Sequence, residues 1–129
     1  MEEQGRRPLV LVIEDDRESR RLYADELQRA GYAVSEAHNG LQAVEKATEL
    51  EPDVIVTDLG LPGIDGYELC RRLHRHERLG RIPIVAITGR YLSDADIARA
   101  CREGCQTVLI KPFVGDDLIA EVRKVLKQE

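Results

Sequence analysis

Short apolar runs alternate with longer amphipathic segments along almost the whole chain. The runs are rich in Val and Ile and lie at residues 9–13, 32–34, 54–57, 83–87 and 107–110. Runs of this length are typical of strands that are buried on both faces of a parallel sheet. The segments between them repeat apolar residues at helical spacing, at residues 17–30, 40–50, 66–76, 94–103 and 116–127. Five strands in strict alternation with five helices predict an α/β fold with a doubly wound parallel sheet.

Polar residues and glycines mark the ends of the expected helices. Three pairs have the spacing of a capping box, namely Asn39 with Gln42, Asp65 with Glu68, and Ser93 with Asp96. Gly31 and Gly104 stand where two helices should end, because glycine readily adopts the left-handed conformation that closes many helices. These signals agree with the periodicity.

Composition narrows the class of protein. A chain of 129 residues suits one domain, with a core at about residues 8–127. No apolar stretch approaches the roughly 18 residues of a membrane span, and the N-terminus lacks the apolar segment of a signal peptide. We therefore expect a cytoplasmic domain that does not contact a membrane.

The net charge of −5 argues against direct nucleic-acid binding, which needs a basic surface. Basic residues nevertheless gather in one stretch, which consists of Arg71, Arg72, His74, Arg75, His76, Arg78 and Arg81. We favour a solvated helix face as its interpretation, and a docking patch for an acidic partner is the alternative.

The chain has three cysteines, Cys70, Cys101 and Cys105. Because the number is odd and no CxxC motif occurs, neither a disulfide framework nor a zinc site is expected. Small buried thiols are the default interpretation.

The expected strands end in polar residues that suit one chemistry. These residues are Glu14, Asp15, Asp16, Asp58, Thr88 and Lys111. In open α/β sheets, ligands bind at the carboxyl ends of the strands, where the strand order reverses. Carboxylates gathered there raise one another's pKa, so a hard cation such as Mg²⁺ (or Mn²⁺) is expected among them. Each residue alone would be an ordinary cap or turn residue, but together they predict a site for a metal and a phosphoryl group.

An ionised Asp58 in such a field can attack phosphorus as a nucleophile and form an aspartyl phosphate. The metal and Lys111 would neutralise charge on the phosphoryl oxygens, and the Thr88 hydroxyl can donate a further hydrogen bond.

The sequence resembles the receiver domain of two-component response regulators from about residue 9 to about residue 126. The motifs that carry the resemblance are VLVIEDD, DLGLPGIDGYEL, ITG and IKPF, which together are highly specific. The resemblance implies a flavodoxin-like fold with strand order 2-1-3-4-5. It also implies a phosphoacceptor signalling domain, not an enzyme, that assists its own phosphorylation and dephosphorylation. The donor would be a phosphohistidine on a sensor histidine kinase or a phosphotransfer protein, and the phosphorylated domain would change conformation and bind a downstream protein.

The resemblance assigns the acidic residues by position. Asp58 resembles the phosphoacceptor, Asp15 matches a direct metal ligand, and Glu14 matches its neighbour, which acts on the metal indirectly or through water. Gly60 matches the residue whose backbone carbonyl completes the metal site. Asp16 falls just beyond the acidic pair, so we expect it to cap a helix.

Other positions follow the same pattern. Thr88 matches the hydroxyl residue whose side chain moves onto the phosphoryl group. Lys111 matches the invariant lysine of the family, which a cis bond to Pro112 would orient. Pro62 and Gly66 would shape the loop after the phosphoacceptor.

Three positions bear on how the state of the site is passed on. Val108 stands three residues before Lys111, where an aromatic ring usually rotates inward when the threonine moves. Tyr91 lies three residues after Thr88, similar to a subset of single-domain receivers with an aromatic residue in that loop. We hypothesise that Tyr91 reports phosphorylation to a partner, so that Tyr91→Ala would remove phosphorylation-dependent binding; simple packing is the alternative. Arg90 would hold phosphoryl charge, contact the kinase or point to solvent.

Two other classes are weighed against this function. A receiver-like interaction module that acts without phosphorylation would lose the acidic pair, the acceptor or the lysine, all of which are present here. A flavodoxin-like cofactor binder would need a phosphate-cradling loop after the first strand, where the acidic EDDRES stands. Because no output domain follows, we expect a stand-alone protein rather than an excised piece, acting through protein partners or by shuttling phosphoryl groups.

Overall fold

Strands and helices alternate from the N-terminal side to the C-terminal side of the computed structural model, which describes residues 7–60, 66–89, 93–111, 113 and 115–127. The strands are β1 (Leu9–Ile13), β2 (Ala33–Ala37), β3 (Val54–Asp58), β4 (Ile84–Thr88) and β5 (Thr107–Ile110). The helices are α1 (Arg17–Arg29), α2 (Gly40–Leu50), α3 (Gly66–Arg75), α4 (Asp94–Arg102) and α5 (Gly115–Val125). The predicted order of elements is confirmed.

All five strands are parallel, and their order in the sheet is β2-β1-β3-β4-β5. Strand β1 pairs with β2 on one side and with β3 on the other, so the order reverses at β1. Parallel pairing brings the carboxyl ends of all strands to one edge of the sheet. The predicted doubly wound fold and its strand order are therefore confirmed.

Strand β2 is the element whose extent the apolar pattern described least well. The pattern indicated residues 32–34, whereas the strand runs from Ala33 to Ala37 and includes Ser35 and Glu36. It is an edge strand, and its first four residues are only partly buried. A strand that is covered on fewer sides tolerates polar residues, so its apolar signal is weaker.

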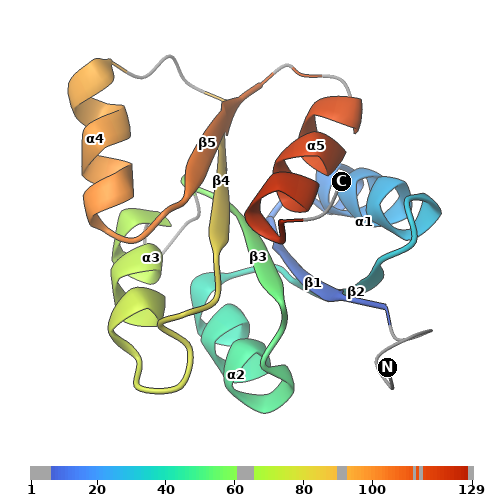
Figure 1. Cartoon of the computed structure of the whole chain (residues 1–129), viewed down its shortest axis with the longest axis horizontal. Coiled ribbons are helices and arrows are strands. Elements are labelled where there is room, and N and C mark those ends of the chain that lie inside the picture. The colour runs from blue at the N-terminus through green and yellow to red at the C-terminus, as the bar shows by residue number, and fades with distance from the viewer. Residues whose placement is uncertain (1–6, 61–65, 90–92, 112, 114, 128–129) are drawn as a thin grey trace.

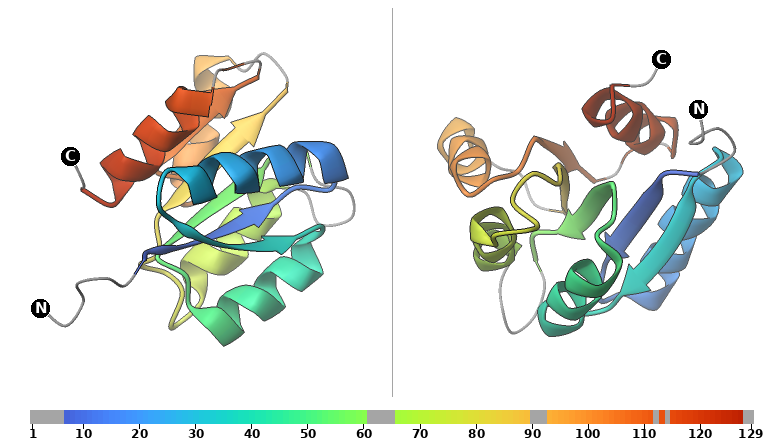
Figure 2. Two further views of the ribbon diagram at one scale, coloured as in Figure 1. Left: turned by 90° about the vertical axis from the view of Figure 1, so that its right-hand side faces the viewer. Right: turned by 60° about the horizontal axis from the view of Figure 1, so that its bottom comes forward.

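Helices cover both faces of the sheet, with α1 and α5 on one side and α2, α3 and α4 on the other (Figures 1 and 2). Successive residues of β1 feed the two cores alternately, because side chains along a strand point to opposite faces. Val10 and Val12 pack with α1 and α5, and Leu11 and Ile13 pack with the other three helices. None of the helices within the described ranges combines the length and apolar character of a membrane crossing.

The helix ends follow the predicted signals. Ser93 and Asp96 form a complete capping box at the start of α4. Asn39 caps α2 by accepting a hydrogen bond from the Gln42 backbone N–H at 2.7 Å, but the Gln42 side chain accepts from His38 instead of Asn39. The Asp65 pair lies partly outside the described residues. Gly31 and Gly104 have φ of 104° and 112°, the left-handed conformation expected of them.

Part of the basic stretch is paired with acidic residues of the same chain. Three of its members have such partners: Arg71 with Glu68 and Glu103, Arg72 with Glu68, and Arg78 with Glu51. Ion pairs of this kind satisfy the guanidinium groups without an external ligand, which favours the solvated helix face over a docking patch.

The cysteines divide into two kinds. Cys70 and Cys105 are buried, as predicted, whereas Cys101 is exposed. Cys101 follows Ala100, the buried residue of α4, and one residue along a helix turns the side chain by about 100°. The prediction of a buried thiol is therefore wrong for Cys101.

Candidate functional site

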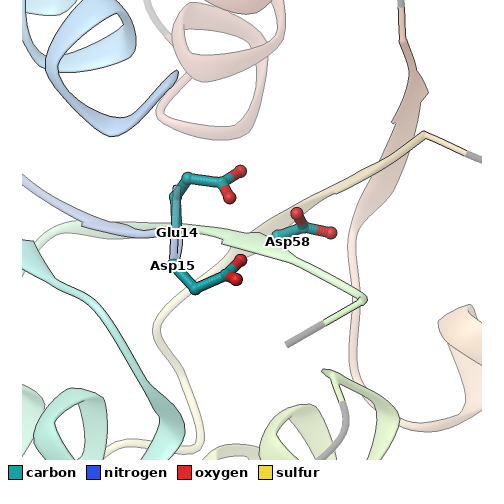
Figure 3. Close-up of side chains that lie close together, drawn as sticks. All are labelled: Glu14, Asp15 and Asp58. Carbon is teal, nitrogen blue, oxygen red and sulfur yellow. The ribbon is translucent and has the colours of Figure 1, made fainter. Parts of the chain in front are cut away.

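Three of the predicted carboxylates meet at the carboxyl edge of the sheet. Glu14 and Asp15 directly follow β1, and Asp58 is the last residue of β3. Each offers an oxygen within 4.8 Å of the others, and Figure 3 shows the carboxylates of Glu14 and Asp15 extending toward the side on which Asp58 lies. They meet because β1 and β3 are neighbours at the point where the strand order reverses.

Lys111 follows β5 and places its ammonium group against this cluster. Its Nζ lies 3.4 Å from Glu14 Oε1 and 3.6 Å from Asp58 Oδ2. Its backbone N–H donates to the Thr88 carbonyl oxygen at 2.7 Å, which ties the end of β5 to the end of β4. The lysine is thus anchored at its backbone and held by two carboxylates at its tip.

Glu14 is almost fully buried, with 2% of its surface exposed. Burial raises the pKa of its carboxyl from 4.5 to about 7, and the nearby Asp58 carboxylate adds to this. The Asp16 backbone N–H, which donates to Glu14 Oε2 at 3.0 Å, and Lys111 act in the opposite direction without cancelling it. The predicted rise in pKa is confirmed for Glu14, although burial and not charge repulsion is the larger cause.

The pKa of Lys111 responds to the same arrangement. Partial burial alone would lower it, but the neighbouring Glu14, Tyr23 and Asp58 outweigh that effect and raise the pKa above its ordinary value. Lys111 therefore stays positively charged across the physiological pH range. The neighbouring Glu14 carboxyl, with a pKa of about 7, changes its charge within that range.

Asp58 presents its two oxygens to different partners. Gly60 N–H donates to Oδ1 at 2.8 Å, while Oδ2 faces Lys111. Gly60 is exposed, and a Cβ added there would lie 3.5 Å from Oδ1, so a larger residue would stand beside the carboxylate. The backbone carbonyl that the resemblance assigns to a metal stays a prediction.

Thr88 is the last residue of β4 and is buried, with 4% of its surface exposed. Asp58 pairs in register with Ile87, so Thr88 lies one position further along the adjacent strand. Val108, in the middle of β5, is partly buried against the core that α3 and α4 cover. Arg90 and Tyr91 lie outside the described residues, as do Pro62 and Pro112.

Asp16 takes no part in the carboxylate cluster that the structure describes. Its Oδ2 accepts from the Ser19 backbone N–H at 2.9 Å and from the Ser19 hydroxyl at 2.7 Å, and these bonds lower its pKa. It is the N-cap of α1. The separation of Asp16 from the acidic pair is therefore confirmed.

Residues of α1 support the site in a way that the motifs did not indicate. Arg20 Nη1 donates to the Glu14 carbonyl oxygen at 2.8 Å, and its Nε donates to Glu36 at 3.1 Å. This guanidinium group joins the first strand-end loop to β2. Its place near the start of α1 was visible in the sequence, but its reach to a backbone oxygen was not.

Aromatic rings border the lysine on the side of α1. The Tyr23 ring centroid lies 6.0 Å from Lys111 Nζ, and this ring stacks on Phe113 with centroids 5.9 Å apart. The apolar periodicity placed Tyr23 on the buried face of α1 without indicating this role. Because Tyr23 is one turn from Arg20, the two side chains lie on the same face and the same end of the helix.

Gly66 allows α3 to begin directly against the end of β3. Its N–H donates to the Leu59 carbonyl at 3.1 Å. A Cβ at this position would lie 2.2 Å from Leu59 Cα, a distance that no side chain tolerates. Glycine is therefore required at position 66 by a close contact with the backbone of Leu59, the residue that follows Asp58.

Known proteins are similar to this chain in both sequence and fold. RpaA from Synechocystis sp., a DNA-binding dual master transcriptional regulator, is 36% identical over 121 residues, which cover 94% of this chain and 50% of that protein. The polar-differentiation response regulator DivK from Brucella anthropi is 30% identical over 117 residues, which cover 91% of this chain and 94% of that protein. The chain spans about half the length of the transcriptional regulators that it matches.

Solved structures of response regulators and receiver domains are also similar to this chain in fold. The chemotaxis protein CheY4 of Vibrio cholerae has a TM-score of 0.87 at 28% identity, covering 92% of this chain and 98% of that one. The receiver domain of the sensor histidine kinase PA1611 from Pseudomonas aeruginosa, with a magnesium ion coordinated in its active site cleft, has a TM-score of 0.85 at 29% identity, covering 95% and 99%. The family model of the response regulator receiver domain matches residues 10–123. With this match across nearly all of the sheet and its carboxylate edge, the chain belongs to the response regulator receiver domain family.

Proposed function

We propose that the chain accepts a phosphoryl group on Asp58 from a phosphohistidine of a sensor histidine kinase or a phosphotransfer protein. The observation that carries the proposal is the convergence of Glu14, Asp15 and Asp58 beside the ammonium group of Lys111. This arrangement offers a nucleophilic carboxylate and a fixed positive charge at one edge of the sheet. It matches what phosphoryl transfer requires, namely positioning and neutralisation of the phosphoryl oxygens.

The cluster suits Mg²⁺ or a similar hard divalent cation. Asp15, Asp58 and the Gly60 carbonyl would hold it, and Glu14 would act through water, which together make an all-oxygen donor set. The contact of Glu14 with Asp58 supports this, because the Asp58 charge adds to the burial that raises the pKa of Glu14, and a cation there would offset the repulsion. Asp15 is exposed, so water ligands have access. When bound, the ion supplies positive charge that stabilises the phosphoryl oxygens.

The contacts of Asp58 support the choice of one oxygen as the nucleophile. Because Gly60 N–H holds Oδ1, the oxygen that faces Lys111 is Oδ2. We propose that Oδ2 attacks phosphorus, the N–P bond of the donor breaks, and its electron pair stays on the imidazole nitrogen, which takes a proton from solvent. Lys111 then lies where the transferred oxygens arrive. Hydrolysis removes the phosphoryl group again, because water attacks phosphorus and the Asp58 carboxylate leaves.

The proposal extends to the output of the domain. The Thr88 hydroxyl would turn toward the phosphoryl group and change the surface formed by residues 91–127, where a downstream protein binds. Tyr91 is a proposed contributor to that surface, Arg90 is a proposed contact of the phosphoryl group or the kinase, and Val108 stands where the usual rotating ring would be. We also propose that residues 1–129 form one receiver domain with its core at about residues 8–127, supported by the single sheet that runs through the described residues.

The test uses acetyl phosphate and Mg²⁺, followed by intact-mass spectrometry under acid conditions. The wild-type protein should gain about 80 Da in a base-labile form, and Asp58→Asn should gain nothing. Asp15→Asn should weaken Mg²⁺ binding by about tenfold or more, whereas the matched neighbour Asp16→Asn should leave it within about twofold. An adduct that persists in Asp58→Asn would overturn the assignment. Folded protein that forms no adduct with any donor would favour the interaction module that acts without phosphorylation.

A further inference from the structure

Two buried thiols from distant parts of the chain are in direct contact. Cys70 lies in the middle of α3, and Cys105 lies just before β5, 35 residues further along. Their sulfur atoms are 3.0 Å apart. Cys70 has no exposed surface and Cys105 has 4%. The contact joins α3, which precedes β4 along the chain, to the turn before β5, which comes after β4. It lies away from the carboxylate cluster.

The surroundings favour a bond between the two sulfurs over a metal between them. Both cysteines belong to the apolar core on the α2, α3 and α4 side of the sheet. Among the described residues, the only group of three ligands close enough to share an ion is Glu14, Asp15 and Asp58. A zinc site would need further ligands at the two sulfurs, whereas a disulfide needs only these two atoms.

The backbone on both sides is held in place. Cys105 N–H donates to the Ala100 carbonyl at 3.0 Å, and Gln106 N–H donates to the Ile84 carbonyl at 2.7 Å. Cys70 is fixed within a helix. A disulfide has an S–S distance of about 2.05 Å, so the sulfurs need to approach by only about 1 Å. Small rotations of the two side chains would supply that movement.

We propose that Cys70 and Cys105 are a redox modification site, at which a peroxide-class oxidant forms a reversible intrachain disulfide. The Cys105 sulfur, which has some solvent access, attacks a peroxide oxygen; the O–O bond breaks, water is released, and Cys105 becomes a sulfenic acid. The Cys70 sulfur then attacks the Cys105 sulfur, the S–S bond forms, the S–O bond breaks, and a second water leaves. Two thiols and one hydrogen peroxide thus give one disulfide and two waters.

The bond would pin α3 to the turn that leads into β5, the strand that carries Val108 and ends before Lys111. In a reducing environment the two thiols persist, so the disulfide marks exposure to oxidant and is not a permanent staple. The proposal does not depend on phosphorylation of Asp58. Cys101 is exposed and lies four residues before Cys105, so it provides an internal comparison.

The experiment treats the whole chain with hydrogen peroxide, unfolds it in acid, alkylates the remaining thiols and maps peptides without reduction. Before alkylation, the expected product is about 2 Da lighter than the reduced chain; after alkylation, it contains a peptide linking Cys70 to Cys105 and carries the alkyl group on Cys101. The linked form should melt roughly 5–15 °C higher, and dithiothreitol should reverse the shift. Cys101→Ser should behave as wild type, whereas Cys70→Ala and Cys105→Ala should show neither the link nor the shift.

Peptide mapping of the wild-type chain keeps the proposal testable even if a core variant folds poorly. The proposal is wrong if peroxide adds oxygen to Cys101, or links it to a second copy, while Cys70 and Cys105 both remain open to alkylation after unfolding. It is also wrong if the linked peptide appears only after denaturant is added before the oxidant.

Discussion

Glu14 should make the stability of the metal-free domain fall as the pH rises through neutrality. Its carboxyl is buried, and its pKa is raised from 4.5 to about 7. The folded state therefore binds a proton that the unfolded state releases at lower pH. This stabilising contribution is fully present below about pH 4.5 and is lost as the pH rises through about 7.

The size of the effect follows from the two pKa values. The difference between 4.5 and about 7 corresponds to about 3 kcal/mol of unfolding free energy. Glu14→Gln keeps the shape and the hydrogen-bonding oxygen but does not titrate. Between about pH 5 and pH 8, the wild type should therefore lose most of this difference, about 2–3 kcal/mol, relative to this variant.

The assay is urea unfolding in EDTA at several pH values, with the wild type and Glu14→Gln measured side by side. Effects of titrating groups that do not interact with Glu14 cancel in the difference between the two proteins. Adding Mg²⁺ should stabilise the wild type more at the higher pH, because the ion competes with the Glu14 proton. A difference that stays constant from about pH 5 to pH 8, or grows in favour of the wild type, would refute the reasoning.

Two further variants test other parts of the site. Lys111→Gln should reduce the rate of phosphorylation by acetyl phosphate by about tenfold or more without weakening Mg²⁺ binding, because it removes positive charge that neutralises the phosphoryl oxygens. Intact-mass spectrometry gives the rates and titration calorimetry gives the Mg²⁺ affinities. A parallel loss of both would contradict this role. Gly66→Ala should destabilise the fold by about 3 kcal/mol or more, because the added Cβ would lie 2.2 Å from Leu59 Cα; urea unfolding measures this, and a change below about 1 kcal/mol would show that the backbone yields easily.

Much of the fold was predictable because its signals are local. Apolar runs and helical spacing reflect which faces of each element are buried, and caps such as Ser93 depend on residues three positions away. The resemblance to receiver domains separated Asp16, a helix cap, from Asp15. The edge strand β2 was least well described because its partial burial leaves a mixed apolar pattern.

The chemistry of the candidate site was predictable only in its residue types. The sequence placed Glu14, Asp15, Asp58, Thr88 and Lys111 at strand ends, and the shared edge of a parallel sheet implied that they meet. Which oxygen faces which partner was not visible there. The division of Asp58 between Gly60 and Lys111 depends on backbone and side-chain positions.

The sequence by itself thus determined the order of elements, the edge that bears the site and the kinds of group found there, because these follow from patterns among near neighbours. The tertiary structure alone decided the contacts between distant residues. Lys111 and Glu14 meet across 97 positions, and Cys70 and Cys105 meet across 35. Such meetings depend on strand order, register and packing, and the burial of Glu14 that raises its pKa arises only when all of these are in place.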